Sequence, residues 1–114
     1  MTVPAQSEVW VAQLDPAHGH EQAGTRPVIV MSRDAFNAAG WRLCMCVPLA
    51  TRRRGSPLHV EIAPPEGGVR SASFALVDQV RSLHRSRLIE RWGAVEDHTL
   101  RRIASLLLRI VAPR

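Results

Sequence analysis

The chain has 114 residues, 46% of them hydrophobic, which is the size and composition of one small globular domain, 1–114. No apolar run approaches the ~18 residues of a membrane span. Residues 1–7 lack the basic and apolar regions of a signal peptide, so we expect a cytoplasmic protein. Fifteen arginines, with no lysine, against 10 acidic residues give a net charge of +5. This charge is typical of a protein that binds nucleic acid or an acidic partner, although a merely solvated basic surface would have it too.

Short apolar segments with a period of two, separated by turn residues, predict a series of β-strands. The predicted strands span residues 8–14, 28–32, 43–49, 58–62, 73–80 and 89–95. Two short helical or turn segments are expected between them, at residues 33–39 and 83–88. The first of these would be capped by Ser32 and closed by Gly40.

The end of the chain predicts one amphipathic helix over residues 99–111, capped by Asp97. One face carries apolar residues at i, i+3, i+7 and i+10, namely Leu100, Ile103, Leu107 and Ile110. Short antiparallel strands followed by one helix predict a mainly β, α+β fold. We expect a small curled sheet or barrel packed by the C-terminal helix.

Neither the cysteines nor the histidines form a pattern that predicts a metal site. Cys44 and Cys46 are two residues apart in a predicted strand, so both face the same side, as small buried hydrophobic residues would. The five histidines show no H-x-x-x-H spacing, and there is no C-x-x-C pair. We therefore expect no metal and no other cofactor.

The strongest chemical pattern lies between Gly19 and Ser32, where a loop leads into an apolar strand. Gly19 and Gly24 are turn residues that tolerate a positive φ. Glu21 and Arg26 are a carboxylate and a guanidinium five residues apart at the start of the strand. This pair suits acid–base chemistry or anion binding, although a loop salt bridge would have the same spacing.

The sequence GHEQAGTRP at residues 19–27 has the form G-x-E-Q-x-G-x-R-P and precedes a hydrophobic strand. In this it resembles the MazF/PemK/Kid toxins, which are sequence-specific endoribonucleases of bacterial toxin–antitoxin systems. The likeness covers roughly Glu8 to Ile110. It includes VWV at 9–11, LDP at 14–16, CVPL at 46–49 and DQVRS at 78–82.

The resemblance implies the SH3-like barrel shared by MazF and CcdB, and metal-independent cleavage of single-stranded RNA. In that reaction a base deprotonates the 2′-hydroxyl, a cation stabilises the phosphorane and an acid protonates the leaving 5′-oxygen. The products are a 2′,3′-cyclic phosphate and a 5′-hydroxyl. The family's arginine falls on Arg26, which would stabilise phosphorane charge because a guanidinium is a poor base. Its glutamate falls on Glu21, which would transfer a proton or hold Arg26 in place.

RNA contacts are expected from the loop, from a basic hairpin and from one later glutamine. Planar guanidiniums bind phosphates bidentately, so the arginines of the hairpin predict one lip of an RNA groove, with a solvated loop as the alternative. Trp41 could stack on a splayed base or pack in the core, whereas Trp10 is expected in the core. The predicted RNA-binding residues are His20, Gln22, Thr25, Arg52, Arg53, Arg54 and Gln79.

His20 could also act with a second histidine, His59 or His84, as a two-histidine ribonuclease site. Surface histidines without such a role are the alternative.

One position departs from the family. After the Val-Pro at 47–48 the family has a hydrophobic residue and then a Thr or Ser whose hydroxyl serves the phosphate site. Here that position is Ala50, and Thr51 follows one residue later. In an extended strand Thr51 would face the other way, unless the register shifts where the strand ends. Thr51 is therefore the candidate catalytic hydroxyl only if such a shift occurs.

The leading hypothesis is a homodimeric endoribonuclease toxin neutralised by a cognate acidic antitoxin. A homodimer is expected because Leu106, Leu108 and Val111 lie off the main apolar stripe of the C-terminal helix. One alternative is a family member that binds RNA but cleaves it slowly or not at all, because of Ala50. Another is a non-enzymatic gyrase poison of the CcdB type, although the chain lacks the exposed C-terminal Trp on which that activity depends.

Overall fold

The computed structural model describes residues 2–16 and 18–114. Its strands are β1 (Glu8–Gln13), β2 (Thr25–Val30), β3 (Leu43–Ala50), β4 (His59–Ile62), β5 (Ser73–Leu76), β6 (Arg81–His84) and β7 (Leu88–Ala94). Its helices are α1 (Asp34–Asn37) and α2 (Asp97–Val111), with 3-10 turns η1 (Glu66–Gly68), η2 (Val77–Gln79) and η3 (Arg85–Arg87).

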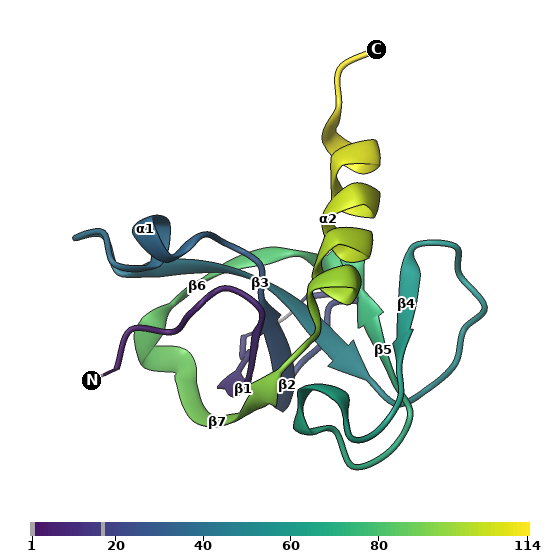
Figure 1. Cartoon of the computed structure of the whole chain (residues 1–114), viewed down its shortest axis with the longest axis horizontal. Helices are drawn as coiled ribbons and strands as arrows, with labels where there is room; N and C mark the ends of the chain where they lie inside the picture. Colours follow the sequence, from purple (N-terminus) through teal and green to yellow (C-terminus); the bar gives the residue numbers. More distant parts are fainter. Residues whose placement is uncertain (1, 17) are drawn as a thin grey trace.

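All strand pairs are antiparallel, and the sheet has the order β4-β5-β3-β2-β1-β7. The long strand β3 organises it, because β3 pairs with β6 through residues 43–46 and with β5 through residues 49–50. The sheet curls into a small barrel from which α2 rises (Figure 1). The predicted mainly β fold with a C-terminal helix is confirmed.

The two faces of the sheet have separate apolar cores. Val47 and Leu49 on β3 belong to the larger core, which also contains Ile103 of α2. Cys44 and Cys46 face the other side and are fully buried in the second core. This burial confirms their prediction as small buried hydrophobic residues, and it raises the pKa of both thiols.

Helix α2 packs on the barrel as far as Leu107. Thr99 and Ile103 are buried, but Leu108, Ile110 and Val111 are 63%, 44% and 64% exposed. The helix extends beyond the barrel, as Figure 1 shows, so the predicted apolar stripe is wrong at Ile110. No helix in the described part of the chain is long and apolar enough to cross a membrane.

Several predicted boundaries are wrong. β2 begins at Thr25, three residues early, because its pairing with β1 extends to Gln13. The predicted strand 73–80 is interrupted by η2, because β3 pairs with β5 at one end and with β6 at the other. The segment 83–88, predicted as a turn or helix, contains the end of β6 and the turn η3.

Neither predicted helix cap forms. Helix α1 begins after Arg33, and the hydroxyl of Ser32 instead accepts a hydrogen bond from the Met45 N–H at 2.9 Å. Asp97 lies in the first turn of α2, where it bonds the Nε of Arg101 at 2.7 Å. Neither side chain therefore caps the backbone N–H groups at the start of its helix.

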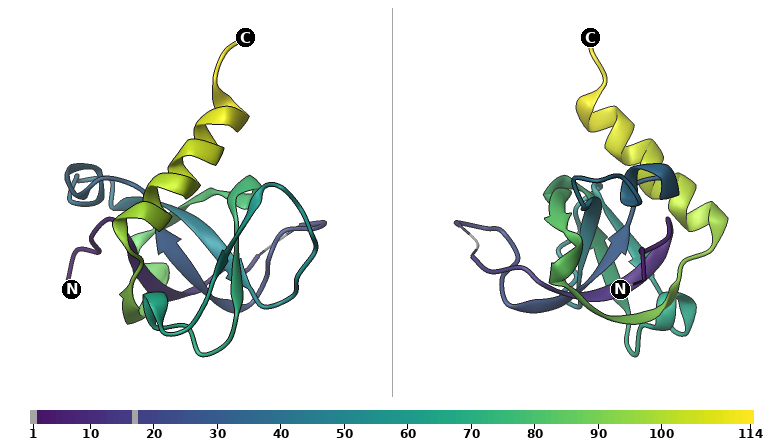
Figure 2. Two further views of the ribbon diagram at one scale, coloured as in Figure 1. Left: turned by 45° about the vertical axis from the view of Figure 1, so that its right-hand side comes forward. Right: turned by 90° about the vertical axis from the view of Figure 1, so that its left-hand side faces the viewer.

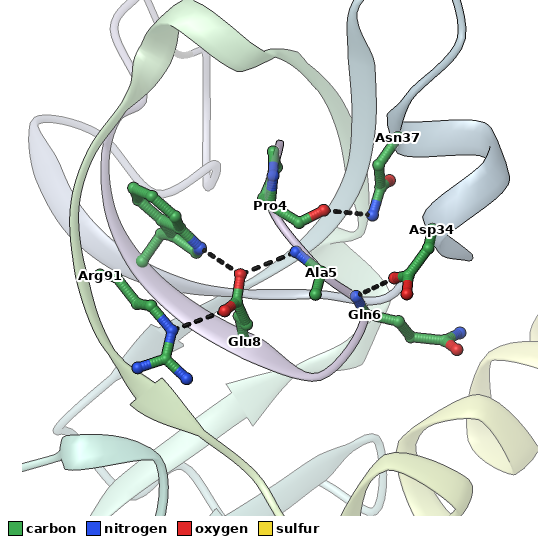
Figure 3. A network of polar contacts seen from close by, with 8 residues as sticks. Pro4, Ala5, Gln6, Glu8, Asp34, Asn37 and Arg91 are labelled. Carbon is green, nitrogen blue, oxygen red and sulfur yellow. Dashed lines mark hydrogen bonds and ion pairs between the residues drawn. The ribbon is translucent and has the colours of Figure 1, made fainter. Parts of the chain in front are cut away.

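The N-terminal segment is attached to the barrel by a polar network around Glu8 (Figure 3). The carboxylate of Glu8 accepts hydrogen bonds from the Ala5 N–H, the Trp10 indole and Arg91. Partial burial acts to raise the pKa of Glu8, but these bonds outweigh it, and the pKa lies below its usual value. Trp10 is partly buried against the second core, close to its predicted position.

Candidate active site

A pocket of about 310 Å³ lies between the β1–β2 loop, the end of β3 and the start of β6. The loop that forms one wall projects from the barrel (Figure 2). We call this cavity the first pocket. It is lined by Leu14, His20, Glu21, Gln22, Pro48, Asp78, Gln79, Val80 and Arg81.

The loop is closed at its base by two hydrogen bonds to Gly24. The Leu14 N–H donates to the Gly24 carbonyl at 2.8 Å, and the Gly24 N–H donates to the Asp15 carboxylate at 2.9 Å. Gly24 has a φ of +72°, and Gly19 a φ of +60°, as predicted for both. A side chain at either position would be strained, so glycine permits the shape of the loop.

Gln79 holds the loop over the pocket. Its Oε1 accepts a hydrogen bond from the Gln22 N–H at 2.9 Å, and its Nε2 donates to the His20 carbonyl at 3.2 Å. These two bonds flank Glu21, whose Oε1 accepts from the His18 N–H at 2.7 Å. Gln79 therefore positions Glu21, a role that the sequence did not predict for it.

Asp78 and Arg81 also line the pocket, and sequence reasoning assigned neither of them. Asp78 has a side chain 44% exposed, and its Oδ1 lies 3.5 Å from the Nε2 of His59. Arg81 donates through Nη1 to the Leu14 carbonyl at 3.2 Å. The resemblance at residues 78–82 was the available signal, but only Gln79 was taken from it.

Arg26 does not line the first pocket. It is exposed on β2 opposite Ala12, and its Nε donates to the Ala23 carbonyl at 3.2 Å. The last β2–β3 pair is Val28 with Pro48, and Pro48 lines the pocket. Beyond this pair β3 leaves β2 and pairs with β5, through Leu49 with Ala75 and Ala50 with Phe74.

Ala50 is the last residue of β3, paired with Phe74 of β5 and 8% exposed. Alternation along β3 puts it on the same face as Pro48, but Ala50 packs with Phe74 and Leu76 and does not line the pocket. Thr51 is exposed beyond the end of the strand and does not line the pocket.

The remaining predicted residues are separated from this pocket. Thr25 is exposed on β2. The three arginines of the 51–58 loop are exposed, and Arg53 pairs with Glu61 at 2.7 Å and lies 4.8 Å from the ring centre of Phe74. This loop borders another cavity, lined in part by His59.

His59 and His84 line cavities other than the first pocket, so the structure does not bring either to His20 there. Trp41 is 59% exposed and packs against Phe36. In residues 2–16 and 18–114, no group of three or more His, Cys, Asp or Glu side chains is arranged to hold a metal ion.

The chain is similar to known proteins in both sequence and fold. A model of the family described as PemK-like, MazF-like toxin of type II toxin–antitoxin system matches residues 5–111. The chain belongs to this family. It is 36% identical over 96 residues to the endoribonuclease toxin MazF of Escherichia coli K12, covering 83% of this chain and 81% of that protein. The predicted class, an endoribonuclease toxin, is thereby confirmed at the level of the family.

Solved structures of MazF proteins have the same fold. A MazF crystal structure from Deinococcus radiodurans superimposes with a TM-score of 0.85 at 30% identity, over 99% of this chain and 100% of that one. A MazE–MazF structure from the same organism gives 0.79 at 30% identity, over the whole of both chains. The Mycobacterium tuberculosis toxin MazF-mt6 gives 0.75 at 19% identity, over 90% of this chain and 93% of that one, and supports the fold alone.

Proposed function

We propose that this MazF-like chain is a sequence-specific endoribonuclease that cuts single-stranded RNA without a metal ion. The observation that carries the proposal is the convergence of Glu21, Asp78 and Arg81 in the first pocket. Arg26 is on β2, two residues before Val28, whose β3 partner Pro48 lines that pocket. A phosphodiester entering the pocket would meet two carboxylates and a guanidinium. These groups suffice for attack by the 2′-hydroxyl, which leaves a 2′,3′-cyclic phosphate and a 5′-hydroxyl.

The two carboxylates can take the two proton-transfer roles. Glu21 is held in a defined position by Gln79, through the backbone bonds on either side of it. Asp78 lies across the pocket and faces His59. One carboxylate would accept the proton of the 2′-hydroxyl while the other, protonated, would supply the leaving 5′-oxygen.

The guanidiniums stabilise the phosphorane. Arg26 is exposed, and within residues 2–16 and 18–114 only its Nε–H donates a hydrogen bond, so we expect its Nη atoms to bind a phosphate oxygen. Arg81 would contribute a second positive charge within the pocket. Charge-assisted hydrogen bonds of this kind favour the transition state when their donors are held in place beforehand.

RNA on either side of the cut would contact the loop and the basic hairpin. His20 and Gln22 line the pocket, and Thr25 continues the exposed side of β2. The hairpin arginines 52–54 are exposed and would bind backbone phosphates outside the pocket. The net charge of +5 supports binding of RNA and of an acidic antitoxin.

The proposed partners are a cognate acidic antitoxin, a second copy of the chain and RNA, in the cytoplasm. A MazE–MazF complex is known for the Deinococcus relative, which supports an antitoxin partner. The apolar residues Leu108, Ile110 and Val111, exposed at the projecting C-terminal end of α2, support a homodimer.

A weakened endoribonuclease is the second candidate, because Ala50 stands where the family hydroxyl is expected. Thr51 is exposed beyond the end of β3 and does not line the first pocket, which favours this candidate over a register shift that brings in Thr51. The family membership disfavours the gyrase poison.

The test is incubation of one long single-stranded RNA with the purified protein in excess EDTA, followed by analysis of the new ends. Cuts at a recurring short sequence that leave cyclic phosphates are expected. Activity that disappears in EDTA and returns with magnesium would contradict the metal-independent reaction. RNA that is bound but never cut would leave the weakened family member as the correct description.

A further inference from the structure

A second pocket lies at the other end of the β3–β6 ladder, where the α1–β3 turn meets η3. Arg42, His84, Arg85 and Ser86 line it, and none of them lines the first pocket. The two segments are joined by the pairing of Leu43 with His84 and by the Arg85 N–H, which donates to the Arg42 carbonyl at 2.8 Å. The lining is thus held by backbone contacts, although its side chains come from distant parts of the sequence.

The second pocket is lined by basic side chains and by no acidic one. Within the described residues, neither Arg42 nor Arg85 has a carboxylate within 4.0 Å, whereas Arg53, Arg91 and Arg101 are paired. The Nε of Arg85 is buried and has no hydrogen-bond acceptor there. Buried guanidinium N–H groups usually have an acceptor, so the pocket has unmet capacity for an anion.

His84 adds a third donor. The Ser86 N–H donates to Nδ1 of His84 at 3.2 Å, and the Ser86 hydroxyl lies 2.8 Å from the same atom. Nδ1 therefore carries a lone pair, and the neutral ring has its proton on Nε2. All three basic side chains of the pocket can then donate hydrogen bonds, and its lining contains no carboxylate.

The turn that supplies Arg42 also presents an aromatic ring. Arg42 has a φ of +58°, in the left-handed region that non-glycine residues seldom occupy. The preceding Trp41 is 59% exposed and packs on Phe36 at a centroid distance of 5.8 Å. An exposed aromatic ring beside cationic donors is the usual composition of a surface that binds single-stranded nucleic acid.

We propose that the second pocket binds a phosphate group, supplied by the backbone of an RNA that extends beyond the first pocket. This inference rests on the proposed function. Arg81 at the first pocket and His84 at the second are three residues apart on β6, which is about 10 Å along a strand. One flexible RNA strand can therefore reach both pockets. A free phosphate ion would satisfy the same donors, and an acidic peptide would place carboxylates there.

The experiment measures equilibrium binding of a labelled single-stranded RNA to the wild type and to two double variants, by fluorescence anisotropy over a series of salt concentrations. The variants are Arg42→Gln/Arg85→Gln and the charge-matched control Arg101→Gln/Arg109→Gln on α2. We expect the first pair to weaken binding about tenfold and to reduce the slope of log K against log salt by about 0.7 per lost phosphate contact. Cleavage of a short RNA confined to the first pocket should not change. Thermal unfolding of each variant shows that it is folded.

NMR of the wild-type side chains identifies the occupant. Long RNA should shift the His84 ring and Arg85 Nε signals, and inorganic phosphate should reverse that shift by competition. Signals that respond to inorganic phosphate or to an Asp/Glu-rich peptide, but not to RNA, would overturn the assignment to RNA. If RNA binding weakens equally in both double variants, the second pocket is not a specific phosphate site, and the proposed function is unaffected. A wild-type protein that binds no RNA would overturn both.

Discussion

The residue with the clearest predicted effect is Ala50, which fills the position of a family hydroxyl. A hydroxyl that donates to a charged phosphorane oxygen contributes about 1.5–3 kcal/mol. Ala50→Thr should therefore raise the cleavage rate about ten- to a hundredfold, with little change in RNA affinity. Single-turnover cleavage and anisotropy measure the two quantities.

Ala50→Val is the matched control, because valine has nearly the shape of threonine but no hydroxyl. It should leave the rate low, since Ala50 already packs against Phe74 and Leu76 and gains only a contact. Thr51→Ala should also have little effect. A neutral Ala50→Thr together with an inactive Thr51→Ala would show that Thr51 supplies the hydroxyl after all.

Gln79 is predicted to act through the loop that it holds. Gln79→Ala removes the two bonds that flank Glu21, each worth about 0.5–1.5 kcal/mol. We expect a cleavage rate at least about tenfold lower, because Glu21 is no longer held in place. Faster amide exchange at Gln22 in the variant would confirm the cause. Gln79→Glu keeps the acceptor for the Gln22 N–H, so its cleavage rate should lie between those of the wild type and Gln79→Ala. Unchanged amide exchange in Gln79→Ala would contradict the positioning role.

At the scale of the elements, the Glu8 network joins β1 to β7 and to the N-terminal segment. Glu8→Gln should lower the free energy of unfolding at pH 7 by about 1–3 kcal/mol, because charged hydrogen bonds are lost. The pKa of Glu8 is lowered in the folded protein, so its contribution is present above the unfolded value of about 4.3 and is lost as pH falls through the folded value. Denaturant unfolding over a range of pH should show the difference from wild type disappearing in acid. A difference that persists below the folded pKa would contradict this account.

The strand elements were predictable where a single pattern decides them. β4 alternates, and the burial of Val60 and Ile62 on one face follows that alternation. β1 was also predicted, but its burial does not alternate, because its pairing with β7 shifts register twice. The break at η2 was not predictable, because the apolar residues at 74–77 and 80 read as one strand and only tertiary pairing of β3 with two partners divides it.

That break also explains which site residues were missed. In a continuous strand Asp78 would have been an ordinary outward-facing residue, but η2 turns it and Gln79 toward the loop. Glu21 and Gln22 were found because they lie in a contiguous motif. Arg26 was expected in the loop and lies in β2, so its approach to the pocket depends on strand register, which loop spacing does not contain.

At the scale of the whole molecule, the exposed apolar residues at the projecting C-terminal end of α2 predict a dimer. Leu108→Glu/Val111→Glu should give a monomer at micromolar concentration, because both residues are exposed in one chain and charge would prevent their burial between two. Ile89→Glu is the control, since Ile89 is 61% exposed on β7. Analytical ultracentrifugation measures the mass of each. A wild-type monomer, or a control that dissociates equally, would contradict the proposed surface.

The central claim is that RNA is cut at the first pocket with the help of Arg26. The most direct test is single-turnover cleavage of one single-stranded RNA, in excess EDTA, by the wild type, Arg26→Ala and the control Arg33→Ala, another exposed arginine outside the pocket. We predict that Arg26→Ala loses at least about a hundredfold in rate, the effect of one charged transition-state contact of about 3 kcal/mol, while Arg33→Ala keeps the wild-type rate. An Arg26→Ala variant that cuts as fast as the wild type would place the chemistry elsewhere on the molecule.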